Sequence, residues 1–177
     1  SLFNFAPNDR LNAFFGNLQK PWESFKDNDG LCHNRTSRFC YSSDTSDRQN
    51  LIVLGDSLIG ALSTEIYNAY RNSYSIYFST YDGCVYGEGI YRFSKGKPHV
   101  SCSLKFQERR SSLVSGTGDG FVIYGGWITH MIGKNNNKGD ILKSNNPKFD
   151  VLKQIEKSII KLSQTHSVIL IDPFIDF

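Results

Sequence analysis

The most informative segment of this chain is Leu51-Ile52-Val53-Leu54-Gly55-Asp56-Ser57, followed directly by Leu58-Ile59-Gly60-Ala61-Leu62. An apolar run that ends in Gly-Asp-Ser and continues with apolar residues at helical spacing predicts a buried strand and then a helix to about Tyr70. Ser57 would lie where the strand ends and the helix begins. Backbone N–H groups there can stabilise a developing oxyanion. Two interpretations stay open: Ser57 is an acyl-transfer nucleophile, or Asp56 or Ser57 simply caps the helix.

Three further apolar segments indicate strands of the same sheet. They cover residues 73–79, 121–124 and 168–171, and Asn146-Pro147 is a typical start for an amphipathic helix before the last of them. Residues 80–118, rich in Gly, Ser and charge, are predicted to form a long excursion over the sheet edge. Strands that alternate with helices predict an α/β fold with a central parallel sheet covered on both faces, a three-layer sandwich of flavodoxin-like type.

Polar residues and glycines follow directly after the predicted strands. In a parallel sheet the ligand site lies at the carboxyl ends of the strands. We therefore expect four residues that follow strand ends to meet at one rim: Ser57, Gly83, Gly126 and Asp172.

Length and composition bound the possible classes of protein. The chain has 177 residues with 39% hydrophobic content, which suits one domain. We expect residues 1–50 to be an irregular arm or linker, with scattered aromatics that pack on the domain, and residues 51–177 to be the domain itself. A formal charge of +3 without a basic cluster argues against a nucleic-acid partner. No apolar run approaches the roughly 20 residues of a membrane span.

The cysteines form two pairs that are close in the sequence, Cys32 with Cys40 and Cys84 with Cys102. Both pairs lie in turn-rich segments, which favours two local disulfides and an oxidising compartment. Four free thiols in a cytosolic protein are the alternative. No Cys/His spacing resembles a zinc site, and we expect no metal or cofactor.

Taken together, these blocks resemble the SGNH (GDSL-like) hydrolase and acyltransferase superfamily. The most similar members are the SGNH domains fused to integral-membrane enzymes that O-acylate cell-surface polysaccharides. The resemblance rests on the cysteines ahead of the first strand, on Leu54 to Ser57, on Cys102, and on three further blocks: 82–84, 122–128 and 168–173.

The resemblance implies a role for each matching position. Ser57 would be the nucleophile and one oxyanion donor through its own N–H, with Asp56 supporting the turn. Gly83 matches the glycine whose N–H is a second donor, because no side chain blocks the acyl oxygen there. Trp127 matches a tryptophan of the third block in the membrane-linked subset, although it can equally be an ordinary packing residue.

Two features depart from the family pattern. The third block carries Gly125-Gly126-Trp127 where typical members supply an Asn side chain as a third donor, so that side chain is missing. None of the four histidines, His33, His99, His130 and His166, stands in the Asp-x-x-His motif that provides the base. We therefore expect a domain truncated at its C-terminus, with little or no turnover from residues 1–177 alone. His130 and Asp172 are weaker internal candidates for base and carboxylate.

The resemblance implies O-acyl transfer, commonly of acetyl, to a polysaccharide through an acyl-enzyme on Ser57. A membrane acyltransferase domain would deliver the acyl group, and the location would be periplasmic or on the cell surface, tethered to that membrane domain. An esterase of the same class and a non-catalytic carbohydrate-binding domain are the alternatives.

Overall fold

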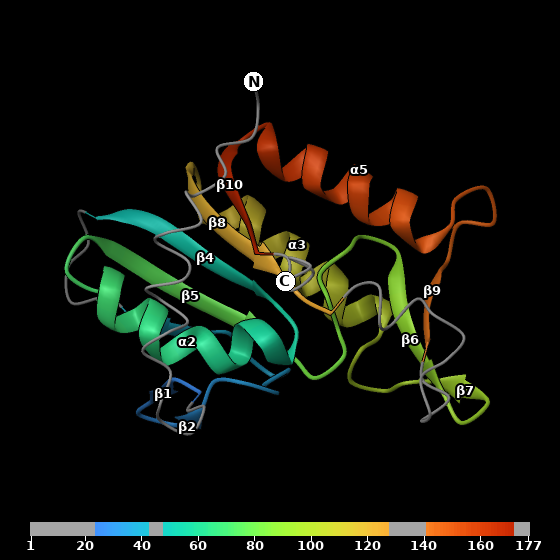
Figure 1. Cartoon of the computed structure of the whole chain (residues 1–177), viewed down its shortest axis with the longest axis horizontal. Coiled ribbons are helices and arrows are strands. Elements are labelled where there is room, and N and C mark those ends of the chain that lie inside the picture. Colours follow the sequence, from blue (N-terminus) through green and yellow to red (C-terminus); the bar gives the residue numbers. More distant parts are fainter. Residues whose placement is uncertain (1–23, 43–47, 128–140, 172–177) are drawn as a thin grey trace, which may run out of the picture.

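The computed structural model of the chain describes residues 24–42, 48–127 and 141–171, and its centre is a five-stranded sheet (Figure 1). Its strand order is β10-β8-β4-β5-β3. Four strands run parallel: β4 (Gln49–Gly55), β5 (Tyr74–Thr80), β8 (Gly120–Gly125) and β10 (His166–Ile171). The predicted parallel pairing of these strands is confirmed. β3 (Cys40–Ser42) adds an antiparallel edge beside β5, which was not predicted.

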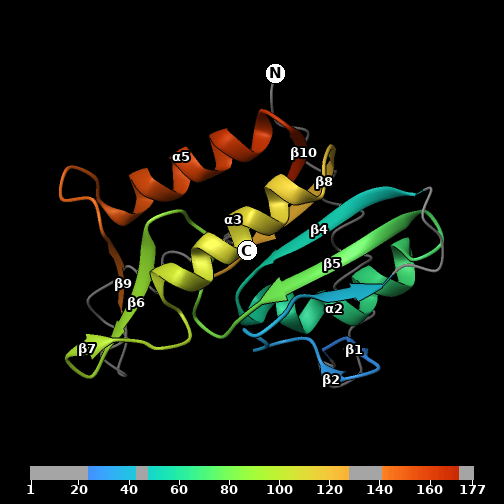
Figure 2. The same cartoon turned by 180° about the vertical axis from the view of Figure 1, so that it is seen from behind.

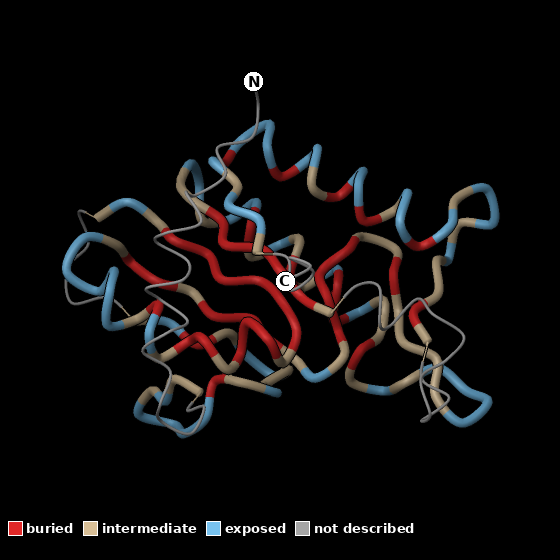
Figure 3. The backbone as a smooth tube through the Cα atoms, viewed as in Figure 1, coloured by how far each residue is buried: buried red, intermediate tan, exposed pale blue. Residues whose placement is uncertain are grey.

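The central strand β4 is buried on both sides, which explains its unbroken apolar run. Leu51 and Val53 belong to the cluster under helix α2 (Ser57–Tyr70). Ile52 and Leu54 belong to a second cluster with residues of α3 (Leu104–Gly116) and α5 (Val151–Ser163). The view from behind shows α3 and α5 across the sheet from α2 (Figure 2). Helices therefore lie on both faces, and the buried backbone is concentrated between them (Figure 3).

Helix α3 corrects the prediction that residues 80–118 are an irregular excursion. That segment contains α3 and the strands β6 (Ile90–Ser94) and β7 (Lys97–Pro98). β6 pairs with β7 and with β9 (Ile141–Ser144) in a separate antiparallel sheet. The face that α3 buries includes Gln107 and Arg110 beside Phe106 and Val114. Because two of these buried residues are polar, the helix shows little apolar periodicity.

The start of α5 also differs from the prediction. Its N-cap is Asp150, whose Oδ1 accepts the N–H of Lys153 at 2.8 Å. Asn146 instead accepts the N–H of Lys148, two residues on, in a local turn, so a helix start at Asn146-Pro147 is wrong. Val151, the first residue of the helix, is buried, whereas Leu152 is 53% exposed.

The described part of the N-terminal region packs against the domain. β1 (Lys26–Asp27) and β2 (Gly30–Leu31) form a small hairpin, and the Phe25 ring lies 4.3 Å from that of Tyr67 and 4.9 Å from that of Phe78. Disulfides join Cys32 to Cys40 and Cys84 to Cys102, the pairing expected from the sequence. The other aromatics of the expected arm, Phe3, Phe5, Phe14, Phe15 and Trp22, lie outside the described residues, and the boundary at residue 50 stays a prediction. None of the described helices is long and apolar enough to cross a membrane.

Candidate active site

Three of the four predicted strand ends meet at one rim of the sheet. The N–H of Tyr81, just after β5, donates to the carbonyl of Gly55 at the end of β4 (3.1 Å). The N–H of Trp127, just after β8, donates to Asp56 Oδ2 at 2.7 Å. The segments that carry Ser57, Gly83 and Trp127 are thus brought together by the parallel topology. Asp172 lies outside the described residues.

Asp56 is the residue that caps helix α2, so the capping interpretation holds for it. Its side chain is fully buried, and Oδ1 accepts the N–H of Leu58 at 2.9 Å while Oδ2 accepts that of Trp127. Burial raises the pKa of Asp56, although the two N–H groups and the charge of Arg110 oppose this. Asp56 therefore ties the turn after β4 to the loop after β8.

Ser57 begins α2 and does not take part in the cap. It is half-buried, and its hydroxyl makes no hydrogen bond with any residue in the described ranges. As the first helical residue, Ser57 also has an N–H without an intrahelical partner. A hydroxyl and a free N–H therefore lie together at the positive end of a helix dipole, a favourable place for developing negative charge.

Gly83 lies in the turn after β5, where its backbone has φ +56°. The turn closes through the N–H of Cys84, which donates to the carbonyl of Tyr81 at 3.0 Å. A left-handed backbone is costly for most residues other than glycine. Within the part of the chain that the structure describes, the Gly83 N–H has no hydrogen-bond partner. This N–H is therefore a candidate donor to a ligand oxygen.

The third block lacks space as well as an Asn side chain. A Cβ built on Gly126 would clash with Val85 Cγ1 and lie 2.9 Å from Asp56 Oδ2. The N–H of the half-buried Trp127 is used by Asp56. The described part of this block therefore supplies no Asn side chain as a third donor, and its Trp127 N–H is occupied.

Arg110, which was not predicted from the sequence, links the carboxyl-terminal ends of β4 and β5 through hydrogen bonds. Its fully buried guanidinium donates to the carbonyls of Gly55 (3.1 Å), Ser79 (3.0 Å) and Cys84 (2.8 Å). Burial lowers its pKa to about 9, so it is a cation at neutral pH. The spacing of Phe106, Arg110 and Val114 at intervals of four was the available signal, and a charged residue in the middle obscured it.

None of the described histidines makes a hydrogen bond with Ser57. His33 uses both nitrogens: Nε2 lies 2.8 Å from Asp82 Oδ1 and Nδ1 lies 3.0 Å from Thr80 Oγ1. His99 Nδ1 accepts the N–H of Cys102. His166 begins β10, at the opposite end of the strands from Ser57. His130 lies outside the described residues.

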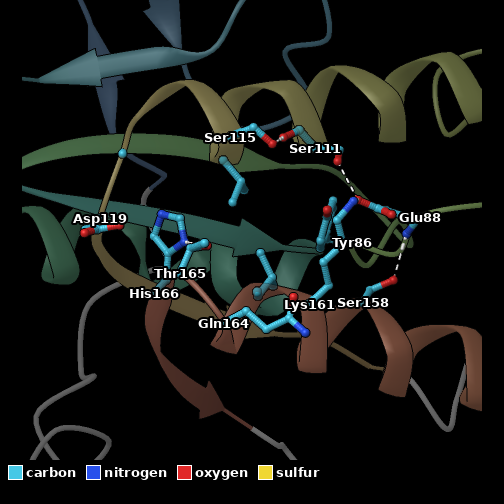
Figure 4. Close-up of a pocket in the computed structure, with 13 residues that line it drawn as sticks. Tyr86, Glu88, Ser111, Ser115, Asp119, Ser158, Lys161, Gln164, Thr165 and His166 are labelled. Atoms are coloured by element: carbon cyan, nitrogen blue, oxygen red, sulfur yellow. Dashed lines mark hydrogen bonds and ion pairs between the residues drawn. The ribbon is translucent and has the colours of Figure 1, made fainter.

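Other clusters give little reason to assign a second chemical site. A cavity of about 300 Å³ lies between α3 and α5, lined in part by Tyr86, Glu88, Lys161 and His166 (Figure 4). Glu88 Oε1 accepts from Ser111 Oγ and from Lys161 Nζ, whereas the buried Nε2 of His166 has no partner among the described residues. The one described group of potential metal ligands is Asp27 with Cys32 and Cys40. Those two sulfur atoms form a disulfide, and Asp27 is paired with Arg35.

The sequence of the whole chain was compared with known protein families and structures. A family model described as SGNH domain (fused to AT3 domains) matches residues 23–177, which is most of the chain. No curated protein and no solved structure matches the chain.

Proposed function

The chain belongs to the family of SGNH domains fused to AT3 domains, and from this premise we propose that it catalyses O-acyl transfer with Ser57 as nucleophile. Membership supports acyltransferase or esterase activity of the SGNH class. The observation that carries the assignment of residues is the rim itself. It presents the Ser57 hydroxyl, which has no hydrogen bond within the described residues, and two N–H groups without partners there, those of Ser57 and Gly83.

The proposed reaction has two steps. Ser57 Oγ attacks the acyl carbonyl and gives up its proton to a base. The N–H groups of Ser57 and Gly83 stabilise the tetrahedral oxyanion, and the leaving group departs with a proton. In the second step a sugar hydroxyl attacks the acyl-serine and loses its proton to the base. The bond between Ser57 Oγ and the acyl carbon then breaks, the sugar ester departs, and the base returns a proton to Ser57.

We propose that the base is a histidine outside the described residues. The resemblance points to the histidine of an Asp-x-x-His motif, and His130 is the candidate within this sequence. The described histidines are a poorer choice, because His33 has both nitrogens engaged and His166 lies at the other end of the strands.

The partners follow from the fusion that names the family. A membrane AT3 domain would supply the acyl group, most simply acetyl, and the acceptor would be a cell-surface polysaccharide. The two disulfides are consistent with a location outside the cytoplasm.

The test uses the full-length protein with 4-nitrophenyl acetate as a soluble donor. We expect an acetyl group on the peptide that contains Ser57, detected by mass spectrometry, and its transfer to an added oligosaccharide. Ser57→Ala should abolish both, while Ser112→Ala, an exposed serine of α3, should change neither. Release of acetate to water only would favour an esterase. The absence of any Ser57-dependent acetylation would favour a carbohydrate-binding domain and contradict the proposal.

A further inference from the structure

The turn that carries Gly83 is held at its tip by a distant segment of the chain. Asp82 is exposed, yet each of its polar groups is bonded to another segment. Its N–H donates to Asn34 Oδ1 (2.8 Å), its Oδ2 accepts from Asn34 Nδ2 (2.9 Å), its Oδ1 pairs with His33 Nε2 (2.8 Å), and its carbonyl accepts from Arg92 Nη1 (2.6 Å). We call His33, Asn34 and Asp82 the clamp.

The contact from Arg92 bears directly on the oxyanion donor. The carbonyl of Asp82 and the N–H of Gly83 belong to the same peptide unit. A trans peptide is planar, so its N–H points opposite to its carbonyl. Arg92 holds the Asp82 carbonyl, and His33 and Asn34 hold the Asp82 side chain and N–H. The direction of the Gly83 N–H is therefore set by groups that lie outside the turn.

The segment that provides the clamp is itself anchored to the sheet. Cys40 lies in β3, opposite Phe78 of β5, and its disulfide brings Cys32 to the same edge. The N–H of Asn34 then donates to the carbonyl of Thr80 at 3.0 Å. Asn34 also has a left-handed backbone with φ +66°, which is uncommon for any residue but glycine. In this conformation the Asn34 side chain makes its two hydrogen bonds with Asp82.

His33 connects the clamp to the helix of the nucleophile. Its ring packs against Gly60, in the first turn of the helix that begins at Ser57, so closely that a Cβ on Gly60 would clash with His33 Nδ1. One imidazole therefore contacts the nucleophile's helix on one side and the turn of Gly83 on the other.

We propose that His33 and Asn34 are positioning residues that orient the Gly83 N–H relative to Ser57. This inference rests on the proposed function of Ser57 and Gly83. The alternative is that the clamp serves stability alone. The two differ in what a broken clamp changes: a misdirected donor weakens binding of the oxyanion, whereas a stability defect lowers the fraction of folded protein.

An exchange of the paired side chains separates these roles. In Asn34→Asp, two carboxylates face each other. In Asp82→Asn, the new amide can face Asn34 with its oxygen only if His33 changes to the tautomer that accepts at Nε2; otherwise two amide groups face each other, and Asn34 cannot turn over without opposing the N–H of residue 82. The double variant N34D/D82N restores every bond, because the carboxylate introduced at position 34 accepts both N–H groups and the amide oxygen introduced at position 82 still accepts from His33.

The readouts are kcat, KM and the affinity for phenylboronic acid in the full-length protein, with active sites titrated. A boronate forms a tetrahedral anion on serine and so reports on the oxyanion donors. For each single variant we expect kcat to fall by up to about 10²-fold, since small misplacements of catalytic groups have effects of this size. Boronate affinity should fall by a similar factor with little change in KM, and N34D/D82N should recover most of both. Asp150→Ala, which removes a distant helix cap, should lower thermal stability without changing boronate affinity per active site.

Each outcome has a separate meaning. If the single variants bind boronate as tightly as the wild type while Ser57→Ala does not bind it, the positioning role is wrong and the proposed function stands. Activity lost only in proportion to the folded fraction would also overturn the positioning role. If Ser57→Ala retains boronate binding and turnover, the proposed function itself fails.

Discussion

Replacement of Asp56 by Asn tests how the rim is held together. The two carboxylate oxygens accept from two separate N–H groups, Leu58 at 2.9 Å and Trp127 at 2.7 Å. Asparagine has the same shape but only one acceptor oxygen, so its NH2 group must face one of these donors. One N–H at the rim then loses its partner, and Arg110 loses a nearby negative charge.

The expected size of the effect follows from two opposing contributions. A hydrogen bond to a charged group contributes about 1.5–3 kcal/mol. Against this, the raised pKa of Asp56 means that burial penalises the ionised carboxylate, and a neutral amide avoids this penalty. We expect the free energy of unfolding at neutral pH to fall by about 2 kcal/mol. Urea unfolding followed by circular dichroism, with the m-value checked for constancy, measures it.

Asp150 offers a matched control for the same substitution. It caps α5 and is exposed, and within the described ranges its side chain accepts only the N–H of Lys153. Because Asn caps helices as well as Asp does, Asp150→Asn should change stability by no more than about 0.5 kcal/mol. If Asp56→Asn costs no more than this control, the two-donor account of the rim is wrong.

Two further predictions concern the same rim. The disulfide Cys84–Cys102 joins residues that are 18 positions apart in the sequence. In the loop-entropy model, replacing both cysteines by Ala should lower the free energy of unfolding by about 3 kcal/mol, which urea unfolding measures. A loss well under about 1 kcal/mol would contradict that model. Burial raises the pKa of Asp82, but the hydrogen bonds from His33 and Asn34 outweigh it and leave the pKa below its usual value. The ionised form therefore stabilises the fold above the unfolded pKa of about 3.9 and loses this effect as the pH falls through the lower folded pKa. The stability difference between wild type and Asp82→Asn should shrink in that acid range, and a difference that stays constant there would refute the assignment.

Local sequence predicted the elements whose buried faces are apolar. β4, β5, β8 and helix α2 were found because a strand buried on both faces leaves an unbroken apolar run and a helix with one apolar face leaves a periodic pattern. β10 was found from its apolar run, although Ile169 and Leu170 are each 36% exposed. Helix α3 left a much weaker record, because its buried face includes Gln107 and Arg110. Arg110 can be buried only because carbonyls from three separate segments surround its guanidinium.

The candidate site divides in the same way. Two features could be predicted from neighbouring residues alone: Ser57 follows a buried strand and begins a helix, and a glycine follows the next strand. The groups that hold Ser57 and Gly83 in place are visible only in the folded chain. Asn34 and Asp82 meet across 48 positions of sequence, and Asp56 reaches Trp127 across 71. Such hydrogen bonds depend on how the strand ends are brought together and leave no periodic pattern in the chain, so the support of the site became visible only when the sheet was assembled.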